Sequence, residues 1–160
     1  MRAALASALA SGHGVLAAGG SAVDAVVAAV CVLEDCEWLN AGRGSVLDAT
    51  GRVSDSALIG AGSFADDATC ALSATGTGDA FIRAGFAHAV DALLRHTGQG
   101  LEAACQRALA SVRALGGSGG CIALDAAGRV ALPFDTEWMA RGLIGPDGRP
   151  RVALRRSEPL

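Results

Sequence analysis

Residues 22–33 of this 160-residue chain form an apolar run with a single charge, Asp24. The run is too long for an ordinary strand and well short of the roughly 18 residues that begin to suggest a membrane span. It follows Ser21, a residue type that caps helices, and a helix that is apolar nearly all round is normally buried on most faces. We therefore expect a helix at the centre of the core, with Cys31 as a small core residue.

The rest of the chain separates helical from extended patterns. Helical spacing of apolar residues predicts three further helices, at 2–18, 79–96 and 101–115. Short apolar or alternating segments predict strands at 45–47, 58–61, 68–75, 121–125, 129–133 and 140–144, with turn-like residues at 48–51. The strand at 68–75 is predicted to be buried on both faces. Separate runs of helices and strands favour an α+β fold.

No internal repeat or linker divides the sequence. We expect a single domain over residues 1–145 and a polar tail at 146–160 that frays in solution. The alanine-rich N-terminus, with its interrupting serines, favours an ordinary helix over a secretory signal.

Charge and cysteine content limit the classes of partner and compartment. All 13 basic residues are arginines, and the net charge of −3 is spread along the chain, which argues against a nucleic-acid or acidic-membrane partner. Arg155 and Arg156 are expected to be a solvated pair in the tail. Five cysteines, an odd number without a Cys-x-x-Cys pair, favour a reducing cytoplasm over a disulfide framework. Cys121 opens a strand pattern and is expected in the core.

Two short motifs carry chemistry that suits an amino acid. Arg52 offers a planar fork of donors to a carboxylate, and Asp55, three residues on, can accept an ammonium group. Alone, such a pair is more often a surface ion pair. Thr75-Gly-Thr-Gly78 ends a predicted strand before a helix that Asp79 can cap, so its amides can converge on an anion. Alone, it is more often an ordinary strand-to-helix turn.

Three blocks together resemble a known family. Asn40-Ala-Gly-Arg-Gly-Ser45, Gly51-Arg-Val-Ser-Asp-Ser56 and Ser73-Ala-Thr-Gly-Thr-Gly-Asp79 resemble the plant-type L-asparaginases and isoaspartyl peptidases, which are N-terminal-nucleophile hydrolases. The resemblance implies a helix-sheet-sheet-helix sandwich, in truncated form. It also implies that the four substrate-binding residues, which hold L-asparagine or a β-aspartyl peptide, are Arg52, Asp55, Thr75 and Gly76.

The same resemblance implies a structural sodium ion and no other cofactor. The matching loop residues are Leu33, Glu34, Cys36, Leu39, Ala41 and Arg43. In the family, backbone carbonyls of this loop surround the ion. Because carbonyl ligands leave little trace in side-chain sequence, an empty turn remains the alternative.

The attacking group of this family is missing from the sequence. Only residues 46–50 separate the first block from the second, where the family carries a self-cleaved linker and the Gly-Thr bond that yields its nucleophile. Gly76-Thr77 is the only Gly-Thr pair, and it lies in the substrate-side turn. We therefore assign no catalytic residue and expect an amidohydrolase by descent that is inactive alone. The alternatives are a non-catalytic subunit, self-associating or complementing another chain, and a product without a stable fold.

Overall fold

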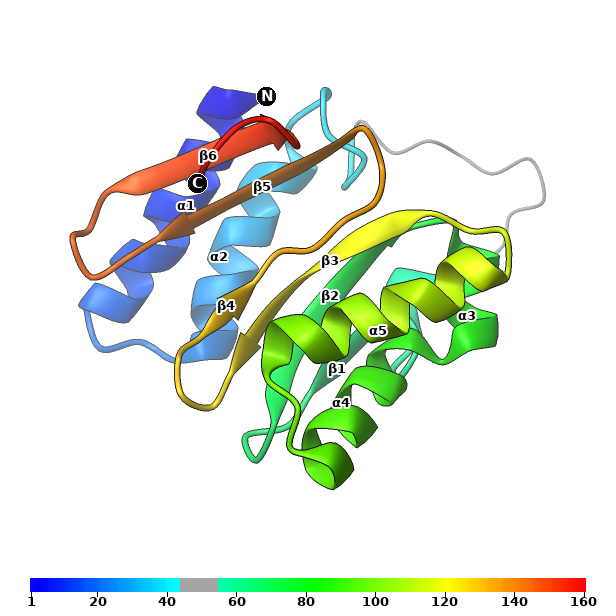
Figure 1. Ribbon diagram of the computed structural model, residues 1–160. Coiled ribbons are helices and arrows are strands. Elements are labelled where there is room, and N and C mark those ends of the chain that lie inside the picture. The colour runs from blue at the N-terminus through cyan, green and yellow to red at the C-terminus, as the bar shows by residue number, and fades with distance from the viewer. Residues whose placement is uncertain (44–54) are drawn as a thin grey trace. The chain divides into compact units, whose positions relative to one another are not determined.

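The computed structural model describes residues 1–43 and 55–160. The chain divides into two compact units: unit 1 comprises residues 1–51 and 138–160, and unit 2 comprises residues 52–137 (Figure 1). Each unit contains both helices and a sheet, which confirms the α+β class. The strand expected at 45–47 and the turn at 48–51 lie outside the described residues, and the single domain at 1–145 stays a prediction.

Unit 1 is a pair of helices with a two-stranded sheet. Its elements are α1 (Arg2–Ala17), α2 (Ala22–Glu34), β5 (Trp138–Ile144) and β6 (Pro150–Arg155). Helix α1 packs against α2 and against both strands (Figure 1). The two helices approach closely because Gly12 lies at their crossing, where a Cβ atom would sit 2.9 Å from the Ala25 carbonyl oxygen. Small residues therefore make this contact.

Helix α2 confirms the predicted helix and corrects its predicted burial. Its N-terminus is capped as expected, since the Ser21 hydroxyl accepts a hydrogen bond from the Asp24 amide (3.1 Å). However, Ala25 is the only buried residue in α2, and Cys31 is exposed, so the expected core positions are wrong. The exposed valines are Val23, Val26, Val27 and Val30. We call these four residues the valine stripe, because their i, i+3, i+4, i+7 spacing places them on one side of the helix.

The C-terminal tail is ordered by a strand that the sequence did not predict. Strand β6 pairs antiparallel with β5, and Ala153 within it is fully buried. Beyond it, the Glu158 carboxylate accepts a hydrogen bond from the Leu154 amide (2.6 Å) and forms an ion pair with Arg2 (2.6 Å). The expectation of a frayed tail is wrong, because backbone pairing and these contacts hold it to β5 and to the start of α1.

Unit 2 is a four-stranded antiparallel sheet covered on one face by helices. Its strands lie in the order β1-β2-β3-β4. The elements in chain order are the 3₁₀ turn η1 (Asp55–Ala57), β1 (Ser63–Ala65), β2 (Cys70–Gly76), α3 (Gly78–Ala84), α4 (Phe86–Thr97), α5 (Leu101–Ala114), β3 (Gly119–Asp125) and β4 (Val130–Ala131). Helices α4 and α5 cover the same face of this sheet (Figure 1).

The core of unit 2 lies between that sheet face and the helices. Helix α5 contributes residues at positions three and four apart, which form one buried stripe: Leu101, Ala104, Cys105, Ala108, Leu109 and Val112. Strand β2 contributes alternate residues, ending with Leu72 and Ala74. Phe81 and Phe86 meet edge to face, with ring centroids 4.9 Å apart, and both are fully buried.

Three sequence expectations for unit 2 need correction. Strand β2 alternates between buried and exposed residues, so it is buried on one face and not on both. Residues 58–61 form a bend, an isolated bridge from Ile59 to Ser63 and a turn, and the strand begins at Ser63. The helix expected at 79–96 is two helices, because Gly85 adopts a left-handed φ of 54° that ends α3 before α4 begins.

A charged cluster fastens the β1–β2 connection to α4. The buried Asp91 carboxylate accepts hydrogen bonds from the Thr69 hydroxyl (2.6 Å) and from Arg95 Nε (2.9 Å). Arg95 also pairs with Asp66 (2.5 Å). Burial favours the neutral form of Asp91, but the bonds from Arg95 and Thr69 outweigh it and lower the pKa of Asp91 below its usual value.

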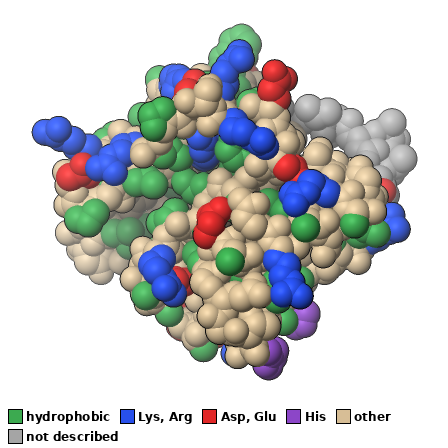
Figure 2. Space-filling model, in the orientation of Figure 1, with side chains coloured by type: hydrophobic (Ala, Val, Ile, Leu, Met, Phe, Trp, Pro, Cys, Tyr) green, Lys and Arg blue, Asp and Glu red, His purple; other side chains and the backbone are tan. Residues whose placement is uncertain are grey.

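The surface agrees with the sequence in its charge distribution. On the face that Figure 2 shows, arginine side chains lie among acidic ones and do not gather into one patch. Within the described residues, no helix combines the length and apolar character needed to span a membrane.

Candidate substrate-binding half-site

The structure brings together Asp55, Thr75 and Gly76, three of the four residues expected to bind substrate. Asp55 opens η1, which packs against β2 and α3. Thr75 and Gly76 are the last two residues of β2. The Ser56 hydroxyl reaches the Ala74 carbonyl oxygen at 3.5 Å, which places η1 beside the end of that strand. The fourth residue, Arg52, lies outside the described residues.

Burial differs sharply within this cluster. Asp55 is 1% exposed, whereas Thr75 and Gly76 are exposed. The exposed Thr75 and Gly76 thus end the strand, and the η1 turn that contains the buried Asp55 packs against the same strand. Such an arrangement suits a small polar ligand, because a shielded carboxylate interacts more strongly with a cationic group than an exposed one does.

The end of β2 packs against β3 without room for side chains at Gly76 and Gly119. These two glycines pair with each other in the sheet. A Cβ atom on Gly76 would lie 2.6 Å from the Gly119 Cα and 2.9 Å from a Phe81 ring carbon. Gly76 also has a φ of 146°, which side-chain-bearing residues rarely adopt. Both glycines are therefore required by the backbone geometry at this strand end.

Thr77 follows Gly76 and is hydrogen-bonded to Ser118, the residue that precedes β3. Its amide donates to the Ser118 carbonyl (2.9 Å), and its hydroxyl accepts from the Ser118 amide (3.2 Å). Helix α3 begins at Gly78, so Asp79 lies in its first turn and is not the predicted cap. Because the nitrogen of Thr77 belongs to a peptide bond, it cannot act as the free amine of an N-terminal nucleophile.

The loop expected to hold sodium lies in unit 1, directly after α2. Its backbone folds back on itself, since the Arg43 amide donates to the Glu34 carbonyl (2.8 Å). Gly42 permits this return, because a Cβ there would lie 2.6 Å from the same oxygen. Other internal bonds engage the carbonyls of Leu33, Cys36 and Leu39. The Leu33 carbonyl accepts bonds from both the Asp35 and the Cys36 amides. The Cys36 and Leu39 carbonyls each accept one such bond from the described residues, and the second lone pair of each oxygen leaves capacity for a cation.

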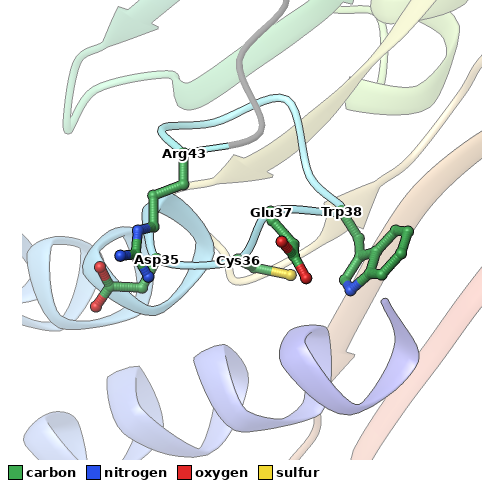
Figure 3. Close-up of a pocket in the computed structure, with 5 residues that line it drawn as sticks. All are labelled: Asp35, Cys36, Glu37, Trp38 and Arg43. Carbon is green, nitrogen blue, oxygen red and sulfur yellow. The ribbon is translucent and has the colours of Figure 1, made fainter.

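A cavity of about 640 Å³ opens beside this loop. It is lined by Asp35, Cys36, Glu37, Trp38 and Arg43, and Figure 3 shows Arg43 reaching towards Asp35 while Trp38 lies at the opposite end. Among the described residues, no three His, Cys, Asp or Glu side chains are grouped to hold a metal ion.

The buried thiols of unit 2 are poor alternative nucleophiles. Cys70, Cys105 and Cys121 all lie in the core, which confirms the expectation for Cys121. Burial raises the pKa of the Cys70 thiol to about 11. The hydrogen bond with Cys105, together with burial, raises the pKa of Cys121 well above its usual value. The raised pKa values keep the Cys70 and Cys121 thiols protonated near neutral pH, so neither is a thiolate that could attack an amide.

Comparison with known proteins decides the family. The family model described as Asparaginase matches residues 1–51 and 48–154. The chain belongs to the plant-type asparaginase family. The two matched segments of this asparaginase-family chain overlap at residues 48–51. At the same place the first sequence block, residues 40–45, is followed closely by the second block, residues 51–56.

Individual relatives match part of this chain and a smaller part of their own length. The chain is 53% identical to the isoaspartyl peptidase of Escherichia coli (strain K12) over 109 residues, which are 68% of this chain and 34% of that protein. It is 51% identical to the isoaspartyl peptidase of Salmonella typhimurium over 57% of this chain and 29% of that protein. A plant-type L-asparaginase of Pyrobaculum calidifontis is 40% identical over 65% of this chain and 35% of that protein. The matches span about a third of each relative's length.

One residue beside the half-site, Gly62, belongs to the segment 51–62 that resembles the family's substrate-binding segment, but its sequence context assigned it no role of its own. Gly62 contacts the backbone of Asp55 directly, and its amide donates to the Asp55 carbonyl (3.0 Å). The available signal was weak, because Gly60-Ala-Gly62 is indistinguishable in sequence from an ordinary turn.

Proposed function

We propose that this chain carries the substrate-binding half of an amidohydrolase of the L-asparaginase or isoaspartyl peptidase type, and that it binds its ligand without hydrolysing it. The single observation that carries the proposal is the placement of a buried Asp55 beside the exposed Thr75 and Gly76. The names of its relatives support the substrate class.

Each group at the half-site would have a distinct role in binding. The Asp55 carboxylate would accept the ligand's α-ammonium group, and Arg52 would take its α-carboxylate in a two-point interaction. The Thr75 hydroxyl and the Gly76 backbone would hold the side-chain amide end. This division fits L-asparagine and β-aspartyl peptides, because both have one amino-acid end and one amide.

The absence of hydrolysis follows from the missing nucleophile. The family's reaction uses a threonine whose own α-amine removes the proton from its hydroxyl. Residues 46–50 leave no room for such a segment between the matched blocks, and Thr77 is held within a turn. Removing the attacking group from an enzyme lowers its rate by orders of magnitude while binding can persist.

Calorimetry and an amidase assay test this proposal together. The protein should bind L-aspartate, a ligand with the same amino-acid end, and should release no ammonia from L-asparagine or a β-aspartyl dipeptide. Asp55→Asn should weaken L-aspartate binding by about tenfold or more, because an ionic hydrogen bond is lost. Thr97→Ser, at the last residue of α4, serves as a control. Turnover by pure chain would contradict the proposal, and so would tight binding by Asp55→Asn.

The proposal includes the finer features that the family implies. A truncated helix-sheet-sheet-helix sandwich is supported by the uncovered face of the unit 2 sheet, where Ile122, Leu124 and Val130 are each 48% exposed. A second sheet packs against such a face in a sandwich. A cytoplasmic location is supported by the five free thiols.

A structural sodium ion is part of the same proposal. The carbonyls that return over the end of α2 would hold it, and the ion would supply local rigidity without a chemical step. Exchanging 100 mM sodium chloride for choline chloride should lower the thermal midpoint of unit 1, since an ion that binds the folded state stabilises it. An identical midpoint in both salts would contradict the site.

The second candidate, a non-catalytic subunit that pairs with another chain, is favoured by the exposed valine stripe. Exposed apolar patches of this kind commonly mark interaction surfaces. Sedimentation velocity separates the two candidates. Self-association that is lost in Val26→Asp would favour the subunit role, whereas a monomer that binds L-aspartate would favour the first proposal.

A further inference from the structure

Gly62 connects the turn that holds Asp55 to the strand that ends at Thr75 and Gly76. Its amide donates to the Asp55 carbonyl (3.0 Å) and also approaches the Leu58 carbonyl (3.2 Å). Its own carbonyl accepts from the Ala74 amide (2.7 Å). A single residue thus joins η1 to the last part of β2 through its backbone alone.

Gly62 also has no space for a side chain. A Cβ atom would overlap the carbonyl carbon and oxygen of Asp55 and lie 2.7 Å from the Ser56 amide nitrogen. These are backbone atoms, so they cannot rotate away as the end of a side chain could. Any substitution must therefore move η1 relative to β2, and it must carry the buried Asp55 with it.

A second, weaker connection runs between the same two elements. The Ser56 hydroxyl donates to the Ala74 carbonyl at 3.5 Å. Both backbone groups of Ala74 are therefore linked to the Asp55 segment, its amide through Gly62 and its carbonyl through Ser56. The next residue along the strand is Thr75, so these bonds set the separation between the backbone of the Asp55 segment and the strand end.

We infer that Gly62 is a positioning residue that holds the Asp55 carboxylate where it can accept the ammonium group of a ligand bound at Thr75 and Gly76. This inference rests on the proposed function and adds to it the origin of selectivity for the ammonium group. A displaced Asp55 would lose the charged hydrogen bond while the remaining contacts to the ligand persisted.

Comparing L-aspartate with succinate isolates this effect, because succinate keeps both carboxylates and lacks the ammonium group. The wild-type protein should prefer L-aspartate by about tenfold or more. Gly62→Ala should bring that preference close to one and leave succinate affinity unchanged. Gly60→Ala is the matched control: a Cβ there meets only the His88 Cβ at 3.6 Å, so the preference should persist despite a strained φ of 86°.

Each outcome has a defined meaning. The inference would be overturned if folded Gly62→Ala kept the wild-type preference for L-aspartate over succinate. It would also be overturned if the variant lost affinity for both ligands equally, because that result indicates a general structural role. If circular dichroism shows Gly62→Ala to be unfolded, the Ser56→Ala variant tests the inference instead. Its preference for L-aspartate over succinate should fall by about twofold or more. An unchanged preference would overturn the inference. If the wild type binds neither ligand, the proposed function itself fails.

Discussion

Helices α5 of unit 2 and α2 of unit 1 use apolar residues in opposite ways. Helix α5 buries its apolar stripe against the sheet and turns charged residues such as Glu102 and Arg107 outward. Helix α2 is more apolar but buries only Ala25, because its close contact with α1 uses small residues and leaves the valine stripe outside. Overall hydrophobicity therefore predicts that a helix has an apolar face, whereas burial depends on what the helix packs against.

The two units can be followed separately in solution. Both tryptophans, Trp38 and Trp138, belong to unit 1, and the chain has no tyrosine. Tryptophan fluorescence therefore reports on unit 1, whereas far-ultraviolet circular dichroism reports on both units. Comparing the two signals during unfolding allows each prediction below to be assigned to one unit.

The largest effect is expected in the unit 2 core. Phe86→Ala removes a fully buried ring and its edge-to-face contact with Phe81, and should lower the free energy of unfolding by about 3–5 kcal/mol. Urea unfolding followed by circular dichroism measures it. Ile82→Ala, at a position 38% exposed in the same unit, should cost much less. If Phe86→Ala shifted the urea midpoint measured by tryptophan fluorescence as much as the midpoint measured by circular dichroism, the two units would unfold as one.

A smaller loss is expected at the buried carboxylate of unit 2. Asp91→Asn weakens the contacts to Arg95 and Thr69 and should cost about 1–2 kcal/mol at pH 7. Because the folded pKa of Asp91 is lowered, its stabilisation is present above about pH 4 and is lost as the pH falls through the folded pKa. The difference between wild type and variant should therefore shrink in acid. The exposed Asp67→Asn is the control, and a pH-independent difference would refute the assignment.

Unit 1 should show a weaker acid dependence through Glu158. The Leu154 amide first, and then Arg2, lower the pKa of Glu158 to about 2, so its stabilisation is present above about pH 4.5 and fades towards pH 2. In urea unfolding at pH 7, Glu158→Gln should lower the midpoint measured by tryptophan fluorescence. This decrease should be smaller than the one that Asp91→Asn causes in the midpoint measured by circular dichroism. Glu37→Gln, at an exposed loop residue, should leave the midpoint unchanged. A larger loss for Glu158→Gln would reverse the ranking of the two units.

The smallest effect is expected on the valine stripe. Val23→Thr and Val27→Thr should each change the free energy of unfolding by less than about 0.5 kcal/mol, because both side chains are more than half exposed. The matched control is Ala25→Val, which adds bulk at the buried contact with Gly12 and should cost distinctly more. A loss above about 1.5 kcal/mol at Val23 would mean that the stripe is covered in solution.

Local patterns in the sequence were sufficient for most elements. Helices α1, α2 and α5 and the β3–β4 hairpin were predicted because apolar spacing and turn residues act over a few positions. The break at Gly85 and strand β6 were missed. Gly85 lies within continuous helical spacing, and β6 is a short arginine-flanked segment whose stability comes from pairing with β5.

The sequence alone determined the family, the α+β class and the identity of the substrate-binding candidates, because motifs and periodicity are properties of neighbouring residues. The tertiary structure alone decided which side of α2 is exposed, that Asp55 lies beside the end of β2, and that Gly62 joins them. These facts depend on atoms far apart in the chain and on the space between them, and a one-dimensional pattern contains neither.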